Sequence, residues 1–346
     1  MGRRSFIVPK IRVSSPFPHP ALLEAPFAVE GPSSFNALAL ELFRLHAAHN
    51  PVYRGFLEAL NVRPEALDSV DRIPFLPIRF FRDQRVLLEN LEPAVTFTSS
   101  GTTGAITSSH HVPWPQLYER SFLTSFRAVY GDPSAWRIIG LLPAYLERQG
   151  SSLVHMAEHL IRASGDPLSG TYLYQYDRLA EVLQQSEAEG RPTLLLGVTF
   201  ALLDLAEKHP MPLRHTTIME TGGMKGRRPE LVREELHYIL KDAFHVPHIH
   251  SEYGMTELLS QAWSTGEGLY RCPPWMQVRL RDANDPFARV EQGRTGGIDV
   301  IDLCNVASCP FISTQDLGRL HADGSFEVLG RFDNSDVRGC SLLYEG

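Results

Sequence analysis

The chain has 346 residues, of which 43% are hydrophobic and 21% are charged, and its formal net charge is -7 at pH 7. This composition is that of a globular protein with one or two domains, and the negative balance argues against a general affinity for nucleic acid. No apolar run approaches the length of a membrane span, and four cysteines without a CxxC pattern indicate a reducing compartment. We therefore expect a cytoplasmic protein with no membrane span and no nucleic-acid partner.

The first 70 residues predict a helical region packed on the core. Residues 1–33 are rich in Pro, Phe and Ser and predict extended coil. Ser34 is a candidate cap for a helix whose apolar side chains recur at helical spacing from Phe35 to Leu45, and a second helix is expected over 53–60. Two prolines in Ile73–Phe81 favour an extended apolar segment, which either packs in the core or lines an apolar substrate channel.

Short apolar strands alternate with amphipathic helices between residues 71 and 277. Strands are predicted over 95–98, 137–142, 193–198 and 216–220, and helices over 116–130, 151–163, 178–186, 200–208 and from Pro229 onward, with Val232, Leu236 and Leu240 on one face. This alternation predicts a layered α/β/α core of mostly parallel sheet. From 278 to 346, strands near 297–303 and 325–329 and the turn Asp323-Gly324 predict a small antiparallel closing lobe that ends in a mobile segment.

A loop rich in small hydroxyls and glycines follows the predicted strand Val95–Thr98. Backbone N–H groups and hydroxyls exposed together are suited to holding phosphate oxygens, although a plain surface turn has the same composition. The candidate phosphate ligands are Ser99, Ser100, Gly101, Thr102, Thr103 and Gly104.

Three later segments carry groups suited to a nucleotide. Ser251–Glu257 joins an aromatic ring that can stack on a base to a carboxylate that can hold Mg²⁺. Asp316, before a glycine turn, is suited to ribose hydroxyls, and Arg331 to ribose or phosphate oxygens. Each pattern alone is also common in structural roles, so the order of the segments matters more than any one of them.

In that order, the loop, Thr221-Gly222-Gly223, Tyr253-Gly254-Met255-Thr256-Glu257, Thr314–Gly318 and Gly330–Asp333 resemble the motifs of the acyl-adenylate-forming superfamily. The resemblance covers about Ile73 to Cys340. Within the superfamily, the segments Ile73–Phe81, Thr221–Gly226 and Arg338–Ser341 resemble the LuxE-type acyl-protein synthetases, which are related to phenylacetate–CoA ligases.

The resemblance implies that ATP and a carboxylic acid, expected to be a fatty acid, give an acyl-adenylate, which a thiol then attacks. The loop would hold the phosphates, Gly222 and Gly223 would lie by the adenine, and Tyr253, followed by Gly254, would stack on it. Thr256 would reach the α-phosphate, Glu257 would bind Mg²⁺, Asp316 would bind the ribose and Arg331 would support the ribose or phosphates. No catalytic base is required, because the work is electrostatic.

The resemblance also implies the acceptor. Most members carry a C-terminal lid with a lysine, and this chain is expected to lack that lid; Lys225 is a candidate substitute, although a surface lysine fits the same position. Cys340 is the expected acyl-accepting nucleophile, as in LuxE-type enzymes, with a reductase or transferase, alone or in a multienzyme complex, as downstream partner. A ligase using CoA or a carrier protein, and a non-catalytic nucleotide-binding subunit, remain alternatives.

The other cysteines and histidines give weaker signals. Cys272, Cys304 and Cys309 match no compact zinc motif and predict buried small hydrophobes. His110 and His111 directly follow the loop, and His155 and His159, four residues apart on a predicted helix, either line a pocket or face solvent.

Overall fold

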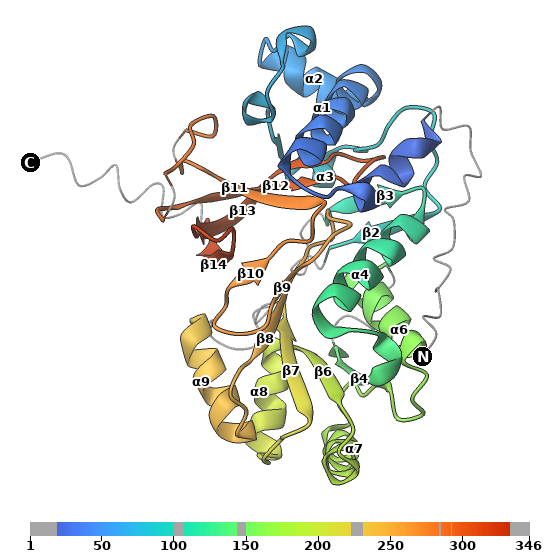
Figure 1. Ribbon diagram of the computed structural model, residues 1–346, viewed down its shortest axis with the longest axis vertical. Helices are drawn as coiled ribbons and strands as arrows, with labels where there is room; N and C mark the ends of the chain where they lie inside the picture. Colours follow the sequence, from blue (N-terminus) through green and yellow to red (C-terminus); the bar gives the residue numbers. More distant parts are fainter. Residues whose placement is uncertain are drawn as a thin grey trace, which may run out of the picture.

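The computed structural model describes residues 19–99, 107–143, 150–222, 231–283, 285–291 and 293–332. Within these residues one sheet of twelve strands runs through the molecule in the order β11-β12-β13-β14-β10-β9-β8-β7-β6-β4-β5, with β1 (Leu76–Pro77) beside β13 (Figure 1). Helices flank the sheet, so the predicted layered α/β fold is confirmed. No helix of the described segments combines the length and the apolar character needed to cross a bilayer.

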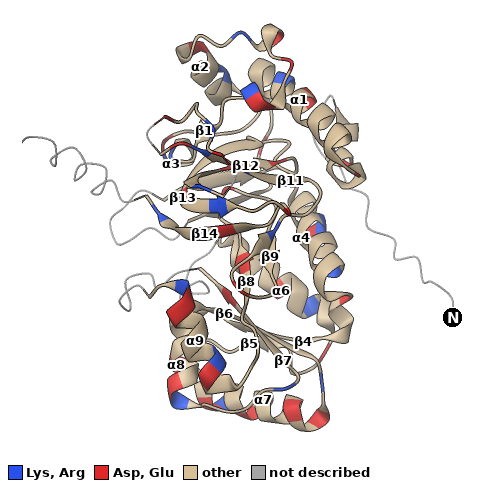
Figure 2. Ribbon diagram, turned by 60° about the vertical axis from the view of Figure 1, so that its left-hand side comes forward, with Lys and Arg blue, Asp and Glu red and all other residues tan. Residues whose placement is uncertain are grey.

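Neighbouring strands in one half of the sheet run parallel. They are β5 (Gly170–Thr171), β4 (Arg137–Leu141), β6 (Thr193–Val198), β7 (Thr216–Thr221) and β8 (His250–Tyr253). Helices α4 (Pro115–Tyr130) and α6 (Ser152–Ser164) lie on one side of this half, and α8 (Thr199–Lys208) and α9 (Arg233–Phe244) on the other (Figure 2). Helix α7 (Tyr176–Glu189) precedes β6. Every residue of β4 and β6 is buried, which is why these strands read as continuous apolar runs.

The other half of the sheet is antiparallel, as the Asp323-Gly324 turn predicts. It contains β9 (Ala262–Ser264), β10 (Tyr270–Arg271), β11 (Met276–Arg281), β12 (Thr295–Asp302), β13 (Phe311–Leu320) and β14 (Phe326–Arg331). Strand β8 pairs with β9, β9 with β10 and β10 with β14, so strands before and after residue 278 belong to the same sheet.

The N-terminal region covers β13 and the segment before it. It contains α1 (Pro32–His49), α2 (Pro51–Ala59), α3 (Phe80–Asp83) and the 3-10 turns Pro20–Leu23, Ala25–Ala28, Pro64–Ala66 and Val70–Arg72. The buried His46 ring bonds the Val306 carbonyl at 3.1 Å, and the Tyr53 ring lies 6.1 Å from that of Phe311. These contacts join α1 and α2 to the antiparallel half.

Three sequence expectations are wrong in detail. Ser34 does not cap α1 from outside, because the helix begins two residues earlier and the Ser34 hydroxyl accepts the Gly31 N–H from within the first turn. Val232 is 66% exposed, because α9 begins only at Arg233. The described part of 1–33 is not plain coil, since it contains two 3-10 turns, the first of which buries Leu22 and Leu23 and the second Pro26.

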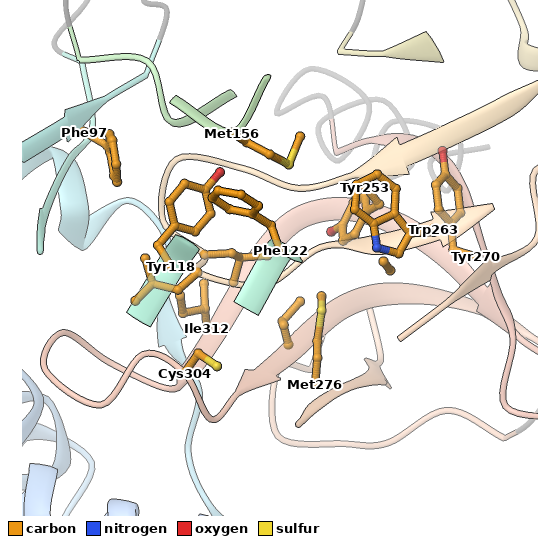
Figure 3. Packing of buried hydrophobic residues seen from close by; sticks show 14 of the residues in the cluster. Phe97, Tyr118, Phe122, Met156, Tyr253, Trp263, Tyr270, Met276, Cys304 and Ile312 are labelled. Carbon is orange, nitrogen blue, oxygen red and sulfur yellow. The ribbon is translucent and has the colours of Figure 1, made fainter. Parts of the chain in front are cut away.

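The strand before the hydroxyl-rich loop lies outside the main sheet. Strand β2 (Val95–Thr98) pairs only with β3 (Ser109–Val112), in an antiparallel ribbon of two strands. In β2 only Phe97 is buried, and the other three residues are half-buried. The Phe97 ring packs on Tyr118 of α4, with centroids 5.5 Å apart, in the aromatic core that Figure 3 shows.

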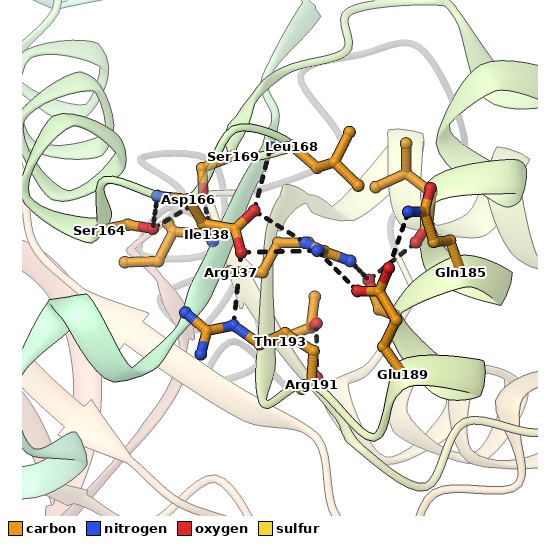
Figure 4. Close-up of polar contacts among 12 residues, drawn as sticks. Arg137, Ile138, Ser164, Asp166, Leu168, Ser169, Gln185, Glu189, Arg191 and Thr193 are labelled. Atoms are coloured by element: carbon orange, nitrogen blue, oxygen red, sulfur yellow. Dashed lines mark hydrogen bonds and ion pairs between the residues drawn. The ribbon is translucent and has the colours of Figure 1, made fainter.

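A buried charge network closes the far end of the parallel half (Figure 4). The Arg137 guanidinium donates to Asp166 at 2.9 Å, to Glu189 at 2.9 Å and to the Ser186 hydroxyl at 2.8 Å. Arg191 lies 3.3 Å from Asp166. The Arg137 and Asp166 side chains are only 5% and 8% exposed. Each charge therefore offsets the free-energy cost of removing the other from water.

Candidate functional site

Side chains from three strands, one in the parallel half and two in the antiparallel half, meet in one place. The Tyr253 hydroxyl, from the end of β8, donates to Asp316 Oδ2 at 2.9 Å, and Arg331 Nε, from the end of β14, donates to Asp316 Oδ1 at 3.2 Å. Asp316 and Arg331 are direct partners across β13 and β14. The Asp316 side chain is 10% exposed and that of Arg331 75%, so an accessible cation covers a nearly buried carboxylate.

The Tyr253 ring is held by other aromatic rings. Phe326 and Tyr270 lie 5.4 and 5.9 Å away in edge-on geometry. Burial, with the charge of Asp316, raises the pKa of Tyr253 well above its usual value, so the hydroxyl stays a hydrogen-bond donor. A neutral donor and a carboxylate side by side suit ligand hydroxyls, which both donate and accept.

Glu257 occupies a second buried position, after the end of β8. It is 5% exposed, and burial raises the pKa of its carboxyl. A hydrogen bond with Ser108 and the positive charges of Arg331 and Arg82 act in the opposite direction. The nearby cations offset part of the cost of burying this carboxylate, and a divalent metal ion bound to the carboxylate would take over that role.

The two ends of the hydroxyl-rich loop are tied together beside Glu257. Ser99 N–H donates to the Ser108 carbonyl at 3.0 Å, and Ser108 N–H donates to Ser99 Oγ at 2.9 Å. Ser108 therefore connects the loop exit to Glu257. Of the predicted phosphate ligands, Ser100, Gly101, Thr102, Thr103 and Gly104 lie outside the described residues.

His110, on β3, ties the ribbon to the segment before Glu257. Its Nδ1 lies 2.8 Å from the Thr256 carbonyl and its Nε2 2.9 Å from Ser308 Oγ. Burial lowers its pKa to about 4, so this ring is a neutral structural link and both its nitrogens are used. Burial alternates along β3, and His110 takes one of the two buried positions, which its place directly after the loop did not reveal. Thr256 itself is half-buried.

Two glycines of the predicted site, Gly222 and Gly254, lie within the described residues, and the local structure explains why each position holds glycine. Gly222 has φ +68°, a conformation that favours glycine, and its carbonyl accepts the Thr199 hydroxyl at 2.9 Å. A Cβ on Gly254 would lie 2.2 Å from Glu252 Oε1. Gly223 and Lys225 lie outside the described residues.

The described cysteines do not provide a reactive thiol. Cys304 and Cys309 are fully buried and Cys272 is half-buried, which supports their prediction as small hydrophobes. Burial raises the pKa of Cys272 and of Cys309 to about 12, and that of Cys304 well above its usual value. Each is therefore a thiol at neutral pH and a poor nucleophile. Cys340 lies outside the described residues.

No protein-family model and no curated protein matches the chain. Solved structures do. An open conformation of 2-hydroxyisobutyryl-CoA ligase, in complex with 2-HIB-AMP and CoA, has a TM-score of 0.65 at 15% identity, over 87% of this chain and 70% of that chain. ATP-bound MatB from Rhodopseudomonas palustris has a TM-score of 0.52 at 18% identity, over 79% of this chain and 52% of that one.

A third similar structure is the luciferase-like enzyme of the nonluminescent mealworm Zophobas morio, with a TM-score of 0.51 at 16% identity over 70% of this chain and 58% of that chain. The chain spans about half the length of the MatB structure. At these identities the likeness establishes the fold, which is that of the large N-terminal domain of adenylate-forming enzymes.

Proposed function

We propose that this chain is an adenylate-forming ligase that activates a carboxylic acid with ATP and transfers the acyl group to a thiol. One observation carries the proposal. Tyr253, Asp316 and Arg331, far apart in sequence, form one hydrogen-bonded group. Glu257 and the tied ends of the hydroxyl-rich loop form a second group that feels the charge of Arg331. The fold shared with a ligase in complex with 2-HIB-AMP supports this interpretation.

The two groups suit the two ends of a nucleotide. Asp316 would accept hydrogen bonds from the ribose hydroxyls, with Tyr253 close to the base and the exposed Arg331 head turning toward ribose or phosphate oxygens. Thr256 and the loop from Ser99 would donate to phosphate oxygens. Mg²⁺ held by Glu257 would neutralise charge on the phosphates, which is the main electrostatic requirement of this reaction.

The reaction balances without a protein base. A carboxylate oxygen attacks the α-phosphorus, and pyrophosphate leaves with the electrons of the broken P–O bond. A thiolate then attacks the acyl carbon, and AMP leaves. The thiol proton passes to solvent or to the departing phosphate.

We propose Cys340 as the acceptor, with a fatty acid as the first substrate to test and a reductase or transferase as the protein that receives the acyl group. The three described thiols are poor nucleophiles, which supports Cys340 or an external thiol as the acyl acceptor. Ligation to CoA is the second candidate, favoured by the CoA in the complex of the 2-hydroxyisobutyryl-CoA ligase.

Exchange of labelled pyrophosphate into ATP, over a panel of fatty, aryl and small acids with Mg²⁺, tests adenylation. We expect exchange with at least one acid class. Asp316→Asn should slow it by about ten- to a hundred-fold, because a hydrogen bond to a charged group contributes roughly 1.5–3 kcal/mol. Asp177→Asn, at a 96% exposed side chain, is the control and should change little. No exchange with any acid, together with measurable ATP binding, would favour a non-catalytic nucleotide-binding subunit.

Mass spectrometry after incubation with ATP, Mg²⁺ and the active acid identifies the acceptor. We expect a hydroxylamine-labile acyl adduct on Cys340 that Cys340→Ala abolishes while pyrophosphate exchange persists. Full turnover of Cys340→Ala with CoA would instead establish the external-thiol ligase.

A further inference from the structure

Three metal-ligating side chains meet away from the proposed nucleotide site, between α4 and α6. Glu119 projects from α4, and His155 and His159 project from successive turns of α6. Glu119 Oε1 lies 3.1 Å from His155 Nε2 and 3.8 Å from His159 Nδ1. All three donor atoms lie within 4.8 Å of one another.

We propose that Glu119, His155 and His159 bind one divalent first-row transition-metal ion, with zinc the first candidate and water completing the coordination. Zinc holds imidazole nitrogen and carboxylate oxygen at about 2.0–2.2 Å, so neighbouring donors of a tetrahedral site lie roughly 3.3 Å apart. The separations of 3.1 and 3.8 Å are within about 0.5 Å of that geometry. The third separation, between the donor nitrogens of the two histidines, is within 4.8 Å, so side-chain rotation that brings the imidazoles together would complete the site.

The sequence spacing supports the same site. His155-Met156-Ala157-Glu158-His159 places two imidazoles four residues apart, on one face of a helix. This H-x-x-E-H spacing is known from zinc-binding helices. Two imidazoles and a carboxylate favour zinc, copper or nickel over Mg²⁺, which prefers oxygen ligands.

The three side chains of the site are partly exposed, so solvent reaches them. The side chains of Glu119, His155 and His159 are 26%, 28% and 26% exposed. Aromatic rings orient the two imidazoles: His155 lies 5.5 Å from Phe97 and 5.9 Å from Tyr118, and His159 lies 5.6 Å from Phe122. The donors are thus held in place by packing while an ion and a water can reach them.

One contact competes with the ion. Arg162 Nη2 lies 3.3 Å from His159 Nδ1, and Arg162 Nε donates to the Glu158 carbonyl at 3.3 Å, both in exposed surroundings. A cation at His159 Nδ1 would displace and repel this guanidinium. Removing Arg162 should therefore tighten metal binding, which a purely structural His–Glu pair does not predict.

An ion here would also tie three elements together. It would cross-link α4 to α6, and His155 packs on Phe97, which lies two residues before Ser99. The metal site shares no residue with the proposed nucleotide ligands, so metal binding here does not depend on the adenylation chemistry.

Calorimetric titration of the full-length, tag-free, chelator-treated protein with Zn²⁺ in saturating Mg²⁺ tests the proposal. We expect saturable binding of one ion, weakened about ten-fold or more in His159→Gln and Glu119→Gln and tightened in Arg162→Ala. His321→Gln is the matched control, because it removes a comparable His–Glu pair at 2.8 Å that has no second histidine, and should bind like the wild type.

Thermal unfolding with and without Zn²⁺ provides a second readout that separates binding from folding. Zn²⁺ should raise the melting temperature of the wild type and of His321→Gln but not of His159→Gln, whose metal-free melting temperature should stay close to that of the wild type. Absence of saturable binding, or equal affinity in the wild type, His159→Gln and Glu119→Gln, would overturn the assignment.

Discussion

Glu252 provides a sharp test of how burial shifts a carboxyl group in this fold. Its Oε2 accepts the Thr221 hydroxyl at 2.6 Å, and the residue is 9% exposed. Burial raises its pKa from 4.5 to about 7, the charge of Glu220 adds to the increase, and the Thr221 hydrogen bond opposes it. We predict that Glu252→Gln stabilises the protein above neutral pH and not in acid.

The direction of this predicted pH dependence follows from how many protons the folded and unfolded states bind. Because the folded-state pKa lies above the unfolded value, the native state holds an extra proton between about pH 4.5 and 7. The stability linked to this proton is fully present below about pH 4.5 and is lost as the pH rises through 7. A difference of about 2.5 pKa units corresponds to about 3 kcal/mol at 1.36 kcal/mol per unit. Glutamine is neutral throughout and escapes this loss.

The assay is urea unfolding, followed by tryptophan fluorescence and circular dichroism, from about pH 5 to pH 8.5. The free energy of unfolding of Glu252→Gln relative to wild type should rise with pH by up to about 3 kcal/mol. Glu65→Gln, at an exposed position, is the control and should show no such trend. A difference between Glu252→Gln and wild type that does not change with pH would refute the reasoning.

Two more substitutions test packing by the same unfolding assay. Arg137→Met should cost about 3–5 kcal/mol, because it leaves Asp166 buried without its main partner, whereas Arg178→Met, at an exposed pair, should cost under about 1 kcal/mol. Equal costs would contradict the buried network. Gly318→Ala should cost about 1–3 kcal/mol, because its Cβ would lie 2.5 Å from the Glu327 carbonyl oxygen. Gly55→Ala, with open space in α2, should instead stabilise by about 0.5–1 kcal/mol, and a gain at both glycines would show that the contact at Gly318 relaxes freely.

Periodicity predicted most of the fold because it reports local burial. The fully buried β6 and the amphipathic α4 follow directly from their residue patterns. The errors occur where a local pattern gives no boundary: the start of α9 leaves Val232 outside the helix, and nothing local shows that β2 pairs with β3 alone.

The order of the motifs proposed a set of candidate site residues, but it could not give their contacts. Tyr253 and Asp316 are 63 residues apart, and their hydrogen bond depends on how β8 and β13 are placed in the sheet. His110 reaches Thr256 across 146 residues, a contact that no spacing rule gives. Glu119 likewise joins the two histidines of α6 only because α4 packs beside that helix.

The single pairing of Tyr270 with Phe326 makes β10 a narrow seam in an otherwise wide sheet. The strands from β5 to β10 and those from β11 to β14 therefore share few backbone hydrogen bonds along this line, which lies inside the antiparallel half, and the Tyr253–Asp316 bond connects the two groups of strands. A molecule bound by both Tyr253 and Asp316 would connect the strands on the two sides of the β10–β14 pairing. Ligand binding would then stabilise the contact between the two groups of strands, and this gain in stability would be set by the affinity for the ligand and its concentration.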